Sequence, residues 1–114
     1  MSMLIAKKLG AVIAMPGREF DSNTSPEAER ILVQQIEAGE TQIVIDFSKT
    51  DYVTSAGLRV IMMAAILLKD KKGKIVMCNG NEQIYEVLEI SGFFEILDYF
   101  KSLDEALSSV SKIN

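Results

Sequence analysis

Residues 44–61 have the sequence VIDFSKTDYVTSAGLRVI, and their pattern indicates the class of fold. It begins within an apolar, β-branched run, QIVIDF (42–47), of the kind expected for a strand covered on both faces. A polar segment, SKTDYVTS (48–55), leads into AGLRVIMMAAILLK (56–69), whose apolar residues recur at helical spacing. A strand, a loop and a helix in this order predict one unit of an α/β domain.

The flanking sequence continues the alternation. Residues 3–15 predict two short strands in a hairpin around Gly10, and a turn-rich loop follows over 16–25. The first expected helix is capped by Ser25, has Pro26 at its first position and stops at Gly39. A strand over 74–78, a helix over 82–90 and a short strand within 93–100 follow. The last expected helix covers 103–112 and is opened by a Ser102–Glu105 capping box. Residues 1–114 are therefore predicted to form a single small α/β domain, with a mixed, mostly parallel β-sheet of four to five strands flanked by about four helices.

Composition excludes several classes of function. The net charge of −4 and the lack of a basic cluster predict no nucleic-acid binding. The longest apolar run, residues 60–68, is too short to span a bilayer, so no direct membrane insertion and a cytoplasmic location are expected. There is one cysteine, Cys78, and no histidine, so no metal site and no cofactor are predicted.

No enzyme is predicted either. The sequence contains no glycine-rich phosphate-binding motif, and without histidine it has no Ser-His-Asp or Cys-His pair. Asp46 ends the strand over 42–47, where a receiver-like signalling domain would carry its phosphate-accepting aspartate. Such a domain also needs an acidic pair after its first strand, which is missing here. We interpret Asp46 as structural, bonding to loop amides.

The functional edge is expected at the carboxyl ends of the parallel strands, where residues 21–25, 48–55 and 79–81 should meet. Ser55 then stands at the start of the second helix. The more frequent role for such a serine is a helix cap, and Thr54 is an alternative cap. The other interpretation is phosphorylation, because a helix N-terminus favours negative charge. Arg59, one turn on, either lies near such a phosphate or is a solvent-facing charge.

The helix over 56–69 has two apolar faces. One comprises Leu58, Ile61, Met62, Ala65 and Leu68, and the other Val60, Met63, Ala64 and Leu67. A surface helix needs one such face. Either both are buried within the domain, or the second is exposed for a partner, as methionine-rich surfaces often are.

The central stretch resembles the signature of the STAS domain of bacterial anti-sigma factor antagonists. The matching residues are Asp46, Ser48, Tyr52, Ser55, Ala56, Gly57 and Leu58, and the resemblance continues through residues 73–97. It departs from the family in two places. Thr54 stands where many members have an acid, and the loop over 17–24 is one residue longer, which affects the role of Asp21.

The resemblance implies a switch protein rather than an enzyme. In its unphosphorylated form it would bind an anti-sigma factor that is also a serine kinase and so release a sigma factor. The kinase would phosphorylate Ser55, and a PP2C-type phosphatase would reverse the modification. The partner-binding surface is predicted to comprise Asp21, Ser22, Asn23, Thr54, Ser55, Ala56, Gly57, Arg59, Val60 and Met63. A weak homodimer stays open, as does a non-switching STAS scaffold subunit of a lipid-transport or stress-signalling complex.

Overall fold

The main sheet has five strands in the order β1-β2-β4-β6-β7. They are β1 (Met3–Lys8), β2 (Ala11–Pro16), β4 (Gln42–Asp46), β6 (Lys74–Cys78) and β7 (Tyr99–Phe100). The β1–β2 pair is the predicted antiparallel hairpin, and the three other pairs are parallel. The computed structural model, which describes residues 2–110, therefore confirms the mixed, mostly parallel sheet.

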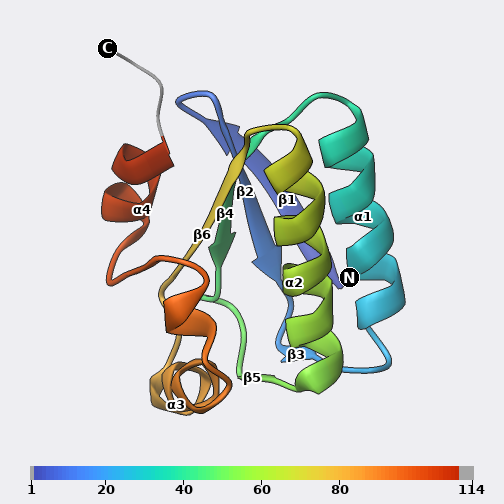
Figure 1. Ribbon diagram of the computed structural model, residues 1–114. Helices are drawn as coiled ribbons and strands as arrows, with labels where there is room; N and C mark the ends of the chain where they lie inside the picture. Colours follow the sequence, from blue (N-terminus) through green and yellow to red (C-terminus); the bar gives the residue numbers. More distant parts are fainter. Residues whose placement is uncertain (1, 111–114) are drawn as a thin grey trace.

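Two layers of helices cover this sheet (Figure 1). They are α1 (Ser25–Glu37), α2 (Ser55–Asp70), α3 (Glu82–Ile90) and α4 (Leu103–Val110), with a short 3₁₀ helix, η1 (Phe93–Glu95), after α3. Helices α1 and α2 lie side by side on one face, α4 lies on the other, and α3 crosses the end of the molecule near the start of α2. The predicted end of the last helix, residues 111 and 112, lies outside the described residues.

The central strands are apolar on both sides because both faces of the sheet are covered. Along β4, Ile43 and Ile45 belong to the core beneath α1 and α2, whereas Val44 belongs to the core beneath α4. All three side chains are fully buried. The side chains of a strand therefore alternate between the two faces although these three consecutive residues are all apolar, which is why a near-continuous apolar run indicated this strand.

A second, two-stranded sheet was not predicted. Strands β3 (Glu19–Phe20) and β5 (Tyr52–Val53) pair in parallel within two segments that the sequence assigns to loops. The prediction of loops was wrong at these positions, because a two-residue strand is too short for a detectable period. This small sheet ties the chain before α1 to the chain before α2.

The predicted start of α1 was wrong by one residue. Thr24, not Ser25, occupies the cap position, and Ser25 is the first helical residue. The Ser25 hydroxyl donates a hydrogen bond to the carbonyl of Asp21 instead of accepting one from the helix. At α4 the Ser102 half of the predicted capping box is confirmed, because the Ser102 hydroxyl accepts a hydrogen bond from the Glu105 N–H at 3.1 Å.

Both apolar faces of α2 are covered within the domain. On the second face, Val60 and Ala64 are buried, and Met63 and Leu67 are half-buried. Helix α1 packs against α2, so this face contacts a neighbouring helix of the same chain. The alternative that this face as a whole lies exposed for a partner is therefore wrong, although Met63 and Leu67 keep part of their surface exposed.

Candidate functional site

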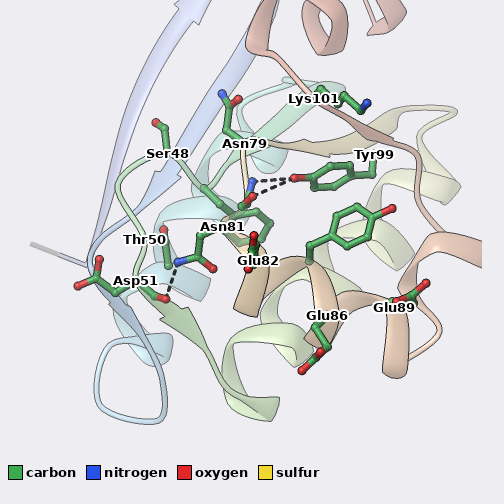
Figure 2. A pocket seen from close by; sticks show the side chains of 13 residues that line it. Ser48, Thr50, Asp51, Asn79, Asn81, Glu82, Glu86, Glu89, Tyr99 and Lys101 are labelled. Atoms are coloured by element: carbon green, nitrogen blue, oxygen red, sulfur yellow. Dashed lines mark hydrogen bonds between the residues drawn. The ribbon is translucent and has the colours of Figure 1, made fainter.

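Three segments meet at the carboxyl edge of the sheet, as the element order predicts. They are residues 21–25, 48–55 and 79–81. The Tyr52 hydroxyl donates to Asp21 Oδ2 at 3.1 Å, which joins the first segment to the second. The Asn81 side-chain amide donates to the Asp51 carbonyl at 2.9 Å, which joins the second to the third (Figure 2). The predicted convergence is confirmed, and hydrogen bonds hold it together.

Ser55 is the first residue of α2, and its side chain is exposed. Thr54 occupies the cap position with an extended backbone (φ −107°, ψ 178°), but its side chain makes no capping hydrogen bond. The prediction that Ser55 caps this helix was wrong, and so was the alternative that the Thr54 side chain does. Ser55 therefore presents its hydroxyl to solvent at the N-terminal end of the helix, where backbone N–H groups point outward.

Gly57 allows this helix start to approach the small sheet closely. A Cβ atom at Gly57 would lie 2.7 Å from Val53 Cγ2 and 2.8 Å from the carbonyl oxygen of Phe20. The backbone N–H of Thr54 donates to that same carbonyl at 3.0 Å. Glycine is required here because β5 and the first turn of α2 pack on β3 without room for a side chain.

Asp21 organises the loop before α1. Its carboxylate accepts hydrogen bonds from the N–H groups of Asn23 and Thr24 at 2.9 and 3.2 Å, in addition to the one from Tyr52. Burial acts to raise the pKa of Asp21, but these hydrogen bonds outweigh it and the net pKa is lowered. The hydrogen bond to Asp21, together with burial, raises the pKa of Tyr52. Asp21 therefore stays ionised and shapes the loop despite the extra residue.

A shallow groove lies beside Ser55, between the starts of α1 and α2. Its volume is about 360 Å³, and its lining includes Ser22, Pro26, Glu29, Ala56 and Arg59. Arg59 and Glu29 bring opposite charges to the two walls. The groove places side chains from the segment 21–25 and from helices α1 and α2 next to the exposed serine.

The predicted partner-binding residues divide into three groups by exposure. Ser22, Asn23, Ser55 and Arg59 are exposed, Asp21, Thr54, Ala56 and Met63 are half-buried, and Gly57 and Val60 are buried. Val60 is 2% exposed because α2 packs against α1, and Gly57 has no side chain to offer. Gly57 shapes this surface from beneath, and Val60 lines the base of the groove beside Ser55 with little exposed area. As partner contacts, both stay predictions. The other eight residues likewise remain a prediction.

Asp46 has the structural role predicted for it. The residue is 4% exposed, and its Oδ1 accepts hydrogen bonds from the Ser48 N–H at 2.9 Å and the Asn79 side-chain amide at 3.1 Å. These bonds orient the segments that follow β4 and β6. Within residues 2–110, no group of three or more histidine, cysteine, aspartate or glutamate side chains is arranged to hold a metal ion.

Sequence reasoning missed two side chains that fix this edge. Asn81 caps α3, because its Oδ1 accepts from the Ile84 N–H at 2.8 Å while its amide reaches Asp51. An asparagine just before a periodic apolar helix was the available signal. Thr50 is buried and donates to the Pro16 carbonyl at 2.9 Å, a contact between distant segments that no local pattern indicates.

The sheet and its edge define a class: a small α/β domain whose converging loops surround an exposed serine at the start of the second helix. Residues 2–106 match the STAS domain model, and the chain belongs to the STAS-domain family. In the part of the chain that the structure describes, none of the helices has the length and apolar character needed to cross a bilayer.

Known proteins similar to this chain include anti-sigma factor antagonists. A Bordetella bronchiseptica protein provisionally named anti-sigma factor antagonist BtrV is 33% identical over 109 residues, covering 96% of this chain and 94% of that protein. A Thermotoga maritima structure provisionally described as an anti-sigma factor antagonist has a TM-score of 0.90 at 19% identity and covers 95% of this chain and 93% of that one. The structure of Bacillus SpoIIAA in its phosphorylated form has a TM-score of 0.74 at 17% identity and covers 95% of this chain and 98% of that one. At these identities the two structures show a shared fold.

Proposed function

We propose that this protein is an anti-sigma factor antagonist controlled by phosphorylation of Ser55. Its unphosphorylated form binds an anti-sigma factor that is a serine kinase and thereby frees a sigma factor in the cytoplasm. The kinase then phosphorylates Ser55 with ATP and releases the antagonist, and a PP2C-type phosphatase resets it. The names of the relatives support the class of function, and the fold shared with phosphorylated SpoIIAA is consistent with the modification.

The observation that carries this proposal is the placement of Ser55. Its exposed hydroxyl stands at the first position of α2, beside the groove that carries Arg59 and Ser22. A kinase needs a reachable hydroxyl on a defined surface, and a partner needs side chains around it. Both conditions are met by the same edge of the molecule.

Phosphorylation acts in this proposal through charge and bulk rather than through unfolding. A phosphoserine adds about −1.5 to −2 charges, which a helix N-terminus stabilises. The same group lies within the contact surface and obstructs the partner. Disrupting one central position of an interface commonly costs ~2 kcal/mol or more, or about thirtyfold in affinity.

The first test is phosphorylation by the anti-sigma-type serine kinase of the same organism with Mg-ATP, followed by mass-spectrometric site mapping. We expect phosphate on Ser55 in the wild type and in Thr54→Ala, and none in Ser55→Ala. Ser48→Ala is the matched control, because Ser48 is an exposed serine of the same segment. Phosphate on Thr54 or Ser48 instead would contradict the assignment of Ser55.

The second test is binding to the same kinase by calorimetry. Ser55→Ala should bind as tightly as the unmodified protein, whereas Ser55→Asp should bind about thirtyfold more weakly. Equal affinity of Ser55→Asp and wild type would reject the charge-block mechanism. Stable partner binding with no phosphate on any residue would favour the non-switching scaffold.

A further inference from the structure

A cavity of about 730 Å³ lies at the carboxyl edge of the sheet, between the segment after β4 and helix α3 (Figure 2). This volume falls within the ~300–1,000 Å³ of small-molecule sites, which gather at this edge of α/β sheets. Ser55 does not line it, and the groove beside Ser55 is a separate one. The proposed switch therefore leaves this cavity without a role.

One wall of the cavity is aromatic and held in place. The Tyr99 hydroxyl accepts a hydrogen bond from the Gly80 N–H at 2.8 Å and donates to the Gly80 carbonyl at 3.3 Å. The Tyr85 ring lies 5.3 Å from that of Tyr99 and 4.7 Å from that of Phe94, between centroids. Tyr85 remains 44% exposed, so its ring can contact a ligand. Because the neighbouring rings already hold it in place, binding would not have to order this wall. Ring faces attract cations.

The ionisable side chains of the cavity are mostly acidic. Glu82, Glu86 and Glu89 line it from α3, and none of the three forms an ion pair within residues 2–110. The cation in the lining is Lys101, whereas the fourth carboxylate, Asp51, is paired with Arg18 at 3.1 Å. A concave surface with this balance repels phosphates and attracts positive charge.

The hydrogen bonds already made within the lining favour the same class of ligand. The amide group of Asn79 donates to Asp46, and that of Asn81 donates to the Asp51 carbonyl. The Tyr99 hydroxyl donates to Gly80. Each of these three neutral groups already donates one hydrogen bond, whereas the carboxylates of Glu82, Glu86 and Glu89 accept none within the described residues. Figure 2 shows Glu82 among the labelled side chains near Asn81 and Tyr99, with Glu86 and Glu89 farther along α3.

We propose that this cavity binds a small organic cation, an ammonium or guanidinium group on a short apolar chain. The charged group lies near Glu82 and Glu86, and the apolar chain lies against Tyr85. The cation is either a free diamine or polyamine or the arginine side chain of a bound protein. The site is independent of Ser55 phosphorylation.

The test is an NMR titration of the ¹⁵N-labelled full chain with agmatine, spermidine, the capped peptide acetyl-Gly-Arg-Gly-amide, and ATP as the anionic probe. We expect saturable shifts at the Gly80 and Asn81 amides with at least one cation and none with ATP. Tight binding by the peptide assigns the site to a partner's arginine, and preference for agmatine or spermidine assigns it to a free amine. Absence of saturation by all three cations at 10 mM, or stronger binding of ATP, overturns the proposal.

Matched variants test whether binding depends on the carboxylates of the cavity or on the negative charge of the protein as a whole. Glu82→Gln and Glu86→Gln remove one charge each with little change of shape, and each should weaken binding about threefold. Glu105→Gln removes an exposed carboxylate from α4, on the other face of the sheet, and should leave the affinity unchanged. Equal effects of all three variants overturn the assignment. Ser55→Ala should bind the cation as the wild type does, so failure of the proposed switch and failure of this site are distinguishable.

Discussion

Gly57 lies where three backbone segments approach one another, and its missing side chain is what permits the approach. Gly57→Ala places a methyl group 2.8 Å from the Phe20 carbonyl and 2.7 Å from Val53. A backbone oxygen cannot rotate away, so we expect unfolding free energy to fall by about 1–3 kcal/mol, measured by urea denaturation. The neighbouring Ala56→Ser should lose about 0.5 kcal/mol through helix propensity. A Gly57→Ala protein as stable as wild type would contradict the steric explanation.

The hydrogen bond between the Tyr52 hydroxyl and Asp21 links the loop before α1 to the loop before α2. Because hydrogen bonds lower the folded pKa of Asp21, its contribution to stability is present above the unfolded pKa and is lost as pH falls through the folded one. Tyr52→Phe removes one of these bonds, so NMR titration of the Asp21 carboxyl carbon should show a higher pKa than in the wild type. Tyr85→Phe, whose ring lies in the separate aromatic cluster, should leave the Asp21 titration unchanged. Identical titrations of Asp21 in wild type and Tyr52→Phe would show that the bond does not form in solution.

Substitutions at the first residue of helix α2 distinguish an effect of added charge from disruption of the helix. Aspartate at position 55 adds a negative charge to the first helical residue, so Ser55→Asp should raise unfolding free energy by about 0.5 kcal/mol at low salt. The neutral Ser55→Asn is the matched control and should show no such gain. In 1 M NaCl the difference should shrink because exposed charges are screened. A Ser55→Asp protein with reduced stability would mean that modification acts by disrupting the helix.

Helix α3 depends on one residue that performs two tasks. Asn81 caps the helix and also holds the Asp51 carbonyl, so Asn81→Ala should cost about 1 kcal/mol for the cap and about 0.5–1 kcal/mol more for the second bond. Ser102→Ala removes a cap with a single bond from α4 and should cost about 1 kcal/mol alone. Equal losses in the two variants, measured by urea unfolding, would argue against the link between α3 and the loop after β4.

The elements that could be predicted from the sequence are those long enough to show a repeating apolar pattern. The strand over 42–47 carries four apolar positions and the helix over 56–69 more than five, and both were located within two residues of their true bounds. Strands β3 and β5 contain two residues each and form because Phe20 and Val53 are brought together by the whole fold. Their pairing is a tertiary effect, and no window of sequence contains both.

Part of the site could be predicted from the sequence, because it depends on the order of the elements. Ser55 was placed at the sheet edge because element order determines which loops meet. The burial of Val60 was not predicted, since an apolar helix face looks the same whether a neighbouring helix or a partner covers it. The cavity beside α3 was missed because its lining comes from segments that share no local pattern.

At the scale of the whole molecule, the central sheet is the part that should open last. Cys78 ends β6, pairs with both β4 and β7, and is fully buried beneath α4. Burial, with a smaller effect from Asp46, raises the pKa of the Cys78 thiol to about 12, so the folded protein holds it as an unreactive thiol at neutral pH. Its modification therefore requires opening of the sheet.

Labelling of Cys78 by a thiol reagent such as DTNB should therefore report global unfolding. At pH 8 the labelling rate should be far below that of a free thiol and should rise with urea with the same slope as the equilibrium unfolding curve. Gly57→Ala should accelerate labelling by the factor that its loss of stability predicts, because it acts on the folded state as a whole. A fast rate in native buffer, or a urea slope well below the equilibrium value, would show that β6 opens locally and that the sheet is not one cooperative unit.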